Sequence, residues 1–347
     1  MRNKQSQSLF FSYRFLLPLL LCGLFGELHA LTQSPARTTS FPTFYTASIA
    51  ISNHGSGRLG DQLLDYVQVK WLSKEYGIPL LLRSNRHLEP FALYEREQLV
   101  PWDTARWPVA TKPLTDLEQL RTAHPEKVIF LLEPVSSNEQ ERREEQPRSP
   151  HLRLPWEEAT FRQWVRELLT LRQPLQLAPL PQGRAKIAVH LRTGGSFTFD
   201  DAAERKRVPL KFPPMSWYEA QLARVLQMVG AKPIYLYLFT DHSKPSEAAK
   251  ALQKMVKKHA KTKDILFDYR KAPAITGKGV LEDLFSMARF DYLIRPTSNL
   301  SLIAAKLGDP LVEIYPEKYV RNKKGTPAIT ESCMRQRDGT ISLLSSP

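Results

Sequence analysis

The chain has 347 residues, of which 42% are hydrophobic and 24% are charged, and its formal net charge is +14 at neutral pH. This is the composition of a globular protein long enough for two domains, which excludes a disordered or fibrous chain. The basic excess predicts an anionic partner, and it fits nucleic acid, an anionic membrane or a phosphorylated or acidic-sugar substrate equally well.

Residues 1–30 are predicted to be a secretory signal, because basic residues precede an apolar run at 15–26 and Ala30 offers a small residue for cleavage. The run is shorter than the roughly 20 residues that span hydrocarbon, so a cleaved signal is favoured over a signal anchor. We expect a protein of the secretory pathway, secreted or periplasmic or lumenal, with a type II membrane-anchored protein as the alternative. Cleavage after Ala30 leaves Cys333 as the single cysteine, which excludes an intrachain disulfide and a cysteine metal cluster.

A stem at residues 31–43, rich in Ser, Thr and Pro, leads into an N-terminal α/β domain predicted at 44–172. This domain opens with a strand at 44–52, a glycine turn, a helix whose apolar residues recur at helical spacing up to Gly77, and a second strand. Such a strand–helix–strand unit predicts a parallel sheet.

Further along this domain, residues 86–125 carry many Pro and Trp and are predicted to be irregular. A strand at 127–134 and an amphipathic helix at 159–171 follow, separated by a mixed charge run that is typical of a solvated loop. Residues 173–183 contain three prolines and a glycine and form the candidate linker.

The second half, residues 184–332, alternates strands and helices again, and 333–347 is predicted to be a tail. The first helix of this half is expected to begin at an N-cap Ser216 and to end at Gly230. The alternation in both halves predicts two Rossmann-like, doubly wound α/β domains that face each other across a cleft.

Polar residues follow two of the predicted strands in the second half, where ligands of open α/β sheets bind. His190 and Arg192 end the strand at 184–192, and Asp241 ends the strand at 232–241. Arg192 is suited to clamp a phosphate through its planar guanidinium, although an isolated pair of this kind more often satisfies polar groups at a strand end. Asp241 fits two roles equally well, a ligand contact or a cap of the next helix.

A third polar stretch, TSNLS at 297–301, opens a helix directly after a strand. Free backbone N–H groups, the positive end of the helix dipole and the hydroxyls of Ser298 and Ser301 together form a candidate anion site, with Asn299 beside them. Simple N-capping accounts for one of these polar residues and not for the whole set. Asn299 also begins a glycosylation sequon, which we interpret as coincidental at a tight helix start.

Four segments in the same order resemble the GDP-fucose-dependent fucosyltransferases, especially the α-1,2 type. GRLGDQLLDYVQVKWLSKEYGIPLLL is similar to their GRLGNQ opening, VHLR to their phosphate motif and FTDH to a later strand-end motif. DLFSMARFDYLIRPTSNLSLIAAKLGDP is similar to their C-terminal block, and the four segments span residues from about 50 to 315.

The resemblance implies two Rossmann-like domains of the GT-B type, no metal cofactor, and GDP held mainly by the C-terminal domain. On this basis the predicted function is inverting, metal-independent transfer of fucose from GDP-fucose to a glycan hydroxyl. Arg192 is the expected diphosphate clamp. The other residues expected to contact the nucleotide sugar are Gly57, Arg58, Gly60, His190, Asp241, Asp283, Ser298, Asn299 and Ser301.

Asp61 stands where family members usually carry Asn, and it either accepts the acceptor proton or bonds backbone within the turn. We expect no metal and no nucleic-acid partner, and a membrane contact only through an uncleaved N-terminal segment. Two alternative functions remain. One is a non-catalytic protein that binds a nucleotide or glycan; the other is a nucleic-acid-binding protein that uses the basic stretch between Lys250 and Lys263.

Overall fold

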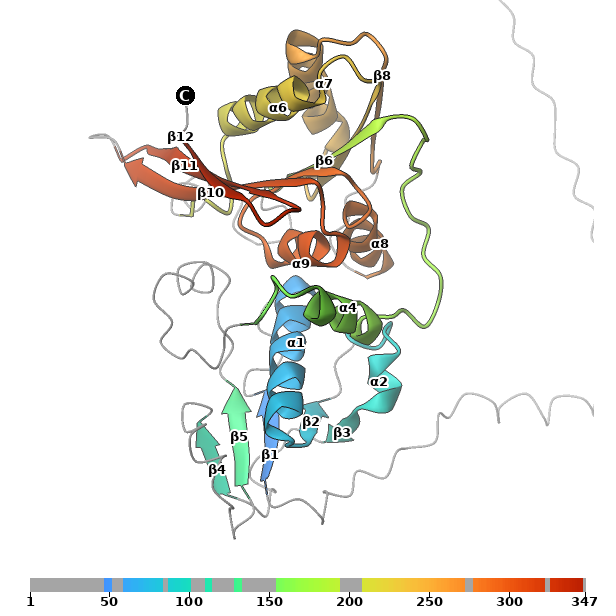
Figure 1. Ribbon diagram of the computed structural model, residues 1–347, viewed down its shortest axis with the longest axis vertical. Coiled ribbons are helices and arrows are strands. Elements are labelled where there is room, and N and C mark those ends of the chain that lie inside the picture. The colour runs from blue at the N-terminus through green and yellow to red at the C-terminus, as the bar shows by residue number, and fades with distance from the viewer. Residues whose placement is uncertain are drawn as a thin grey trace, which may run out of the picture. The chain divides into compact units, whose positions relative to one another are not determined.

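Two β-sheets, each covered by helices, organise the chain in the computed structural model (Figure 1). The structure describes residues 47–51, 59–83, 87–100, 110–113, 128–132, 154–193, 208–271, 277–321 and 325–345. All of them belong to one compact unit, Ser40–Pro347. The predicted signal at 1–30, the stem at 31–43, and the site candidates Gly57 and Arg58 lie outside the described residues.

The N-terminal sheet has the order β3-β2-β1-β5-β4, and every pairing in it is parallel. Its strands are β1 (Ala47–Ile51), β2 (Leu80–Arg83), β3 (Gln98–Val100), β4 (Ala110–Pro113) and β5 (Val128–Leu132). The helices of this half are α1 (Leu59–Tyr76), α2 (Leu93–Arg96) and α4 (Ala159–Leu168). The predicted strand–helix–strand unit is therefore confirmed, whereas the stretch predicted to be irregular contributes α2 and two edge strands.

The C-terminal sheet has the order β12-β11-β10-β9-β6-β7-β8. Its strands are β6 (Ala185–Leu191), β7 (Ile234–Thr240), β8 (Ile265–Tyr269), β9 (Tyr292–Ile294), β10 (Val312–Arg321), β11 (Pro327–Gln336) and β12 (Ile341–Ser345). The helices are α6 (Met215–Val229), α7 (Pro245–His259), α8 (Lys278–Met287) and α9 (Asn299–Gly308). Strands β6 to β10 are parallel and follow the doubly wound order, which reverses between β6 and β9.

Two boundaries in this half differ from the prediction. Residues 333–336 and 341–345, predicted to be a tail, pair antiparallel in β11 and β12 and extend the sheet. Cys333 is buried in this extension, which shows that the segment belongs to the core. Helix α6 begins at Met215 behind Pro214 rather than at Ser216, because proline is compatible with a helix start, and it ends at Gly230 as predicted.

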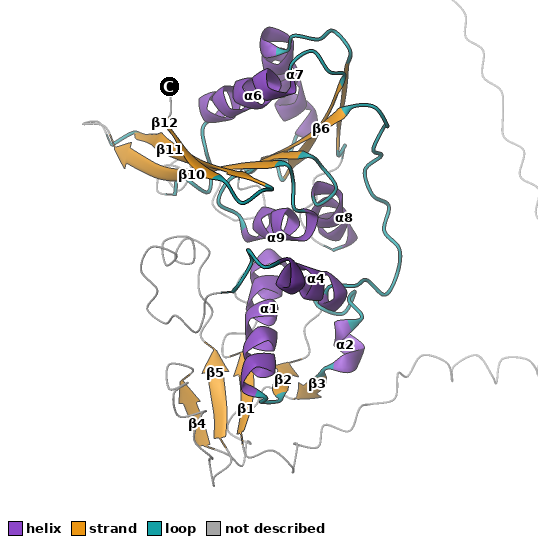
Figure 2. Ribbon diagram, viewed as in Figure 1, coloured by secondary structure: helices purple, strands orange, loops and turns teal. Residues whose placement is uncertain are grey.

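Helices cover the C-terminal sheet on both faces, with α6 and α7 on one side and α8 and α9 on the other (Figure 2). Side chains alternate along β6 accordingly: Ile187 and Val189 pack in the cluster of α6 and α7, and Ala188 packs in the cluster of α8 and α9. The same alternation points His190 toward the face of α8 and α9, which is the face that the cavity described below occupies.

One hydrophobic cluster joins α1 and α4 to α8 and α9. Of the apolar residues predicted for α1, Leu63, Val67 and Leu72 are fully buried in it, and Trp71 packs against it partly buried. No helix in the described part of the chain is long and apolar enough to cross a membrane.

Candidate functional site

A cavity of about 710 Å³ lies beyond the carboxyl ends of β6 and β7, beside the point where the strand order reverses. Ligands of open α/β sheets bind at this place. Both halves of the chain and the segment between them contribute to its wall. The lining residues are Leu59, Gly60, Asp61, His87, Glu89, Pro90, Leu171, Arg172, Gln173, Pro174, Leu175, His190, Arg192, Phe239, Thr240, Asp241, Gly277, Lys278, Val280, Leu281, Asp283, Met287, Ser298, Asn299 and Leu300.

Arg192, the predicted phosphate clamp, follows β6 and lines this cavity. Its side chain is 8% exposed, its Nε lies 3.9 Å from Oδ2 of Asp241, and its guanidinium sits 5.6 Å from the ring centre of Phe212. Asp241 also accepts hydrogen bonds from the backbone N–H and the hydroxyl of Thr193, at 2.7 and 3.2 Å. Asp241 therefore fixes the loop that carries Arg192, and a permanently charged group is held at the cavity wall.

His190 is buried and also lines the cavity. Its backbone carbonyl accepts a hydrogen bond from the hydroxyl of Tyr218 at 3.1 Å, which ties the end of β6 to α6. Burial raises the pKa of Tyr218 well above its ordinary value, and the charge of Asp241 adds to the shift. This tyrosine therefore remains a hydrogen-bond donor at physiological pH.

Helix α9 directs its N-terminus at the cavity, as predicted for the TSNLS stretch. Its N-cap residue, Ser298, has extended backbone angles and makes no side-chain cap bond to the helix. Ser301 differs from the prediction: it is fully buried, its hydroxyl donates to the Ser298 carbonyl at 3.2 Å, and it does not belong to the cavity wall. Residue 301 is the third residue of α9, and its hydroxyl bonds the carbonyl of the N-cap residue, so it supports the helix start.

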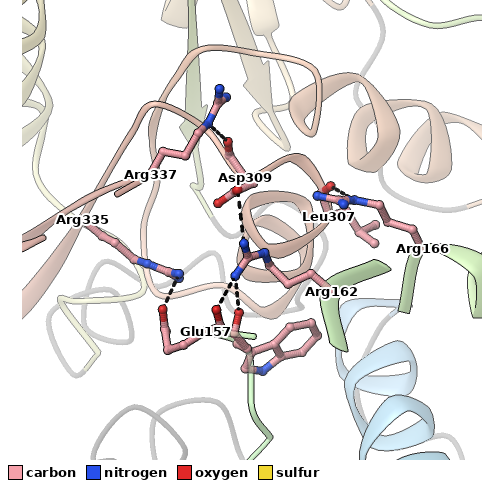
Figure 3. A network of polar contacts seen from close by, with 8 residues as sticks. Glu157, Arg162, Arg166, Leu307, Asp309, Arg335 and Arg337 are labelled. Carbon is pink, nitrogen blue, oxygen red and sulfur yellow. Dashed lines mark hydrogen bonds and ion pairs between the residues drawn. The ribbon is translucent and has the colours of Figure 1, made fainter. Parts of the chain in front are cut away.

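Arginines occupy the opposite end of α9 (Figure 3). Nε of Arg166 donates to the carbonyl of Leu307, and Nε of Arg337 donates to the carbonyl of Asp309, both at 2.7 Å. Arg162 reaches the Asp309 carboxylate at 3.4 Å. Cations at a helix C-terminus complement the negative end of the helix dipole. These arginines therefore stabilise the C-terminal end of α9, and the positive N-terminal end of the helix faces the cavity.

The N-terminus of α1 meets the N-terminus of α9 at the cavity. Nδ2 of Asn299 donates to Oδ1 of Asp61 at 2.6 Å, although the two residues lie 238 positions apart in the sequence. A Cβ atom at Gly60 would collide with the backbone of Asn299 and Leu300, so only glycine permits this approach. Gly60 and Asp61 therefore join the two halves of the wall, and Asp61 bonds a side chain of α9.

Asp283 lines the cavity from α8 and is buried. Its Oδ1 accepts from Nε of Arg270 at 2.5 Å, and Nη1 of the same guanidinium lies 3.2 Å from Oε2 of Glu282. Burial raises the pKa of Asp283 to about 6, and the charge of Arg270 opposes the shift. The wall beside Asp283 is apolar, since Val280, Leu281 and Met287 line it from the same helix.

Several lining residues were not predicted. Lys278 opens α8, and His87, Glu89 and Arg172 come from segments without regular helix or strand. No local pattern marks these residues, because their chemistry depends on the fold bringing the loop at 87–90 beside the segment at 171–175. An antiparallel bridge between Phe91 and Leu171 makes that contact. Within the described ranges, no cluster of three or more His, Cys, Asp or Glu side chains is placed to hold a metal ion.

Comparison with known proteins finds no matching family model and no similar curated sequence. Solved structures with a similar fold include a mutant of Arabidopsis thaliana FUT1 in complex with GDP, at 10% identity and a TM-score of 0.49, covering 82% of this chain and 79% of the other. NodZ α-1,6-fucosyltransferase with GDP has 15% identity and a TM-score of 0.44, covering 87% and 99%. POFUT1 in complex with GDP-fucose has 12% identity and a TM-score of 0.44, covering 76% and 95%. Similarity at this distance assigns no activity to the chain.

Taken by itself, the structure is that of an α/β protein with one parallel and one mostly parallel sheet, and with a partly apolar cavity lined by charged residues of both signs between helices of both halves. The predicted fold class is thus present. Of the candidate residues that the structure describes, it brings Gly60, Asp61, His190, Arg192, Asp241, Asp283, Ser298 and Asn299 to one cavity.

Proposed function

We propose that this protein is a glycosyltransferase that moves fucose from GDP-fucose to a glycan hydroxyl, with inversion and without a metal ion. The single observation that carries the proposal is the pairing of Arg192 with the N-terminus of α9 in one cavity. A fixed cation and a helix N-terminus are the groups that bind a diphosphate. The motif resemblance of the sequence supplies the choice of donor.

The nucleotide is proposed to lie along the C-terminal half of the cavity. Phe239, Leu281 and Met287 offer an apolar surface for a planar base, and the carboxylate of Asp283 accepts hydrogen bonds from N–H groups on the edge of that base. Guanine presents such donors at N1 and at its 2-amino group, whereas N1 of adenine is an acceptor that a carboxylate repels. A guanine nucleotide therefore fits this wall better than an adenine nucleotide.

The chemical step needs two things from the protein. As the bond between the anomeric carbon and the diphosphate breaks, negative charge grows on the departing GDP. Arg192 and the backbone N–H groups at Ser298 and Asn299 are the groups proposed to stabilise that charge, since all three residues line the cavity. The attacking hydroxyl enters from the opposite face of the sugar and must lose its proton.

Asp61 is the proposed acceptor of that proton. It lies at the junction of α1 and α9 and lines the same cavity, and the proposal requires the sugar to lie between its carboxylate and the diphosphate. The hydrogen bond from Asn299 occupies Oδ1 of Asp61. We propose that Asp61 polarises the acceptor hydroxyl and receives its proton as the anomeric centre develops positive charge.

The same hydrogen bond favours a second candidate function, a non-catalytic protein that binds a nucleotide sugar. In that case Asp61 and Asn299 serve only to join the two helices. Donor hydrolysis separates the two proposals: a protein that binds GDP-fucose and never releases fucose from it would be the non-catalytic binder.

The experiment that tests the proposed function compares two arginine variants at opposite ends of β6. Arg192→Ala removes the proposed clamp. Arg184→Ala is the matched control, since Arg184 precedes the strand and pairs with Asp264 at 2.7 Å, away from the cavity. Loss of one such donor costs roughly 3 kcal/mol of transition-state stabilisation, so release of fucose from GDP-fucose by Arg192→Ala should fall by about 100-fold or more.

Arg184→Ala should keep the native rate, because an exposed ion pair contributes little. Native turnover in Arg192→Ala would refute the assignment of the clamp. A secretory-pathway location stays a prediction that rests on residues 1–30 alone.

A further inference from the structure

Asp283, which lines the cavity, also forms an ion pair with Arg270 outside the cavity wall. The guanidinium of Arg270, which directly follows β8, bridges two consecutive carboxylates of α8. Its Nε binds Oδ1 of Asp283 at 2.5 Å and its Nη1 binds Oε2 of Glu282 at 3.2 Å. Among the described residues, none donates to the other oxygen of Asp283, Oδ2.

The contact with Arg270 fixes the orientation of the Asp283 carboxylate. A planar guanidinium that binds through Nε and Nη1 fixes the orientation of the carboxylates it meets more tightly than a lysine does. With Oδ1 occupied, Oδ2 is the oxygen of Asp283 that a ligand in the cavity can reach. One cation shared by two carboxylates also leaves one net negative charge at this part of the wall, which suits a ligand that presents N–H donors.

We propose that Arg270 is a positioning residue for nucleotide recognition: it fixes the orientation of the Asp283 carboxylate so that Oδ2 accepts hydrogen bonds from the base of a guanine nucleotide. The proposal rests on the proposed function for the identity of the nucleotide. Arg270 itself does not line the cavity and acts only through Asp283.

The charges around Asp283 determine in which direction each neighbour shifts its pKa. Burial raises the pKa of Asp283 to about 6, Arg270 lowers it, and Glu282 raises it. The surrounding elements carry further titratable groups: Tyr235 and Tyr237 on β7, Asp268 and Tyr269 on β8, Lys278 on α8, and His190 and Asp61 on the cavity wall. Burial raises the pKa of Tyr237 to about 12, so this side chain is neutral throughout the range of the test.

The test measures GDP affinity by calorimetry between pH 4.5 and pH 8 for the native chain and three variants. Native affinity should fall as the pH drops through about 6, because a protonated Asp283 no longer accepts two hydrogen bonds. Arg270→Gln should move the midpoint of this loss upward by a pH unit or more and weaken binding at least tenfold at pH 7. Glu282→Gln should move the midpoint downward, since it removes a negative neighbour. Lys271→Gln, the exposed next residue, is the matched control and should keep the native midpoint.

The terminal phosphate of GDP also titrates in this range, so the comparison of the variants on one ligand decides the outcome. Opposite shifts in Arg270→Gln and Glu282→Gln support the proposal, because a merely structural role moves stability and not the two midpoints in opposite directions. Equal midpoints in all four proteins would overturn it while leaving the proposed function standing. If Arg270→Gln does not fold, Glu282→Gln still decides: an unmoved or raised midpoint refutes the proposal. Absence of GDP binding by the native chain at every pH would overturn the proposed function, and the inference with it.

Discussion

Replacing Gly60 with alanine places a methyl group where α1 and α9 touch. The added Cβ would lie 2.8 Å from the carbonyl carbon of Asn299 and from Cα of Leu300. The nearest atom is the backbone nitrogen of Leu300, and carbon atoms at rest lie about 3.5 Å apart or more, so the two helix starts must separate by at least about 0.7 Å. Overpacking costs roughly 1–3 kcal/mol, and a clash with backbone on this scale belongs to the upper part of that range, roughly 2–3 kcal/mol. Alanine also favours a helix over glycine by up to about 1 kcal/mol, so we expect a net loss of roughly 1–2 kcal/mol.

Urea unfolding followed by circular dichroism measures this loss as a lower midpoint at an unchanged slope. Glu75→Ala is the control on the exposed face of the same helix, and its effect should stay within about 0.5 kcal/mol. The sign is diagnostic, because helix propensity alone makes Gly60→Ala more stable than the native chain. A variant that is equally stable or more stable would refute the close approach of α1 to α9.

Two further variants test buried charges. Burial, with a smaller contribution from Asp61, raises the pKa of Asp65 from 3.8 to about 7. The protonated form of Asp65 therefore contributes stability that is fully present below pH 3.8 and is lost as the pH rises to about 7. Asp65→Asn should be more stable than the native chain at pH 8, by up to about 4 kcal/mol, and no more stable at pH 3.5. A difference in unfolding free energy between the two proteins that stays constant with pH would contradict this. Glu313→Ala removes the carboxylate that Nε of Arg295, 1% exposed, contacts at 2.6 Å, so a buried charge loses its ion-pair partner. Thermal unfolding should report a loss of about 3–5 kcal/mol, and a loss under 1 kcal/mol would contradict a buried ion pair that excludes water.

Local patterns were enough to predict much of the fold. The apolar spacing of α1, the glycine after it and the apolar strand that follows are encoded within one short stretch, so a parallel unit at residues 44–82 was predictable. The polar ends of β6 and β7 and the start of α9 were predictable for the same reason. Parallel strands bring their carboxyl ends to one edge, which is why Arg192, Asp241 and Ser298 meet at one cavity.

Contacts between segments far apart in the sequence were not predictable from local patterns. The bond from Asn299 to Asp61 and the bridge from Arg270 to Asp283 depend on how helices pack, and no local spacing encodes them. The strands β11 and β12 were missed because β12 is a five-residue edge strand with no buried side chain, and β11 mixes polar and small residues, so neither segment contains an apolar run. Ser301 was misplaced for a related reason: a run of polar residues at a helix start does not reveal which of them turn inward.

We propose above all that the cavity between α1, α8 and α9 is a guanine-nucleotide site in which the diphosphate contacts Arg192. The most direct measurement is a calorimetric titration of the native chain with GDP, with ADP as the competing nucleotide and Arg192→Ala as the variant. We predict saturable binding of one GDP per chain, at least tenfold weaker binding of ADP, and loss of GDP binding in the variant. Failure of the native chain to bind GDP, or equal binding of GDP by the Arg192→Ala variant, would contradict the claim.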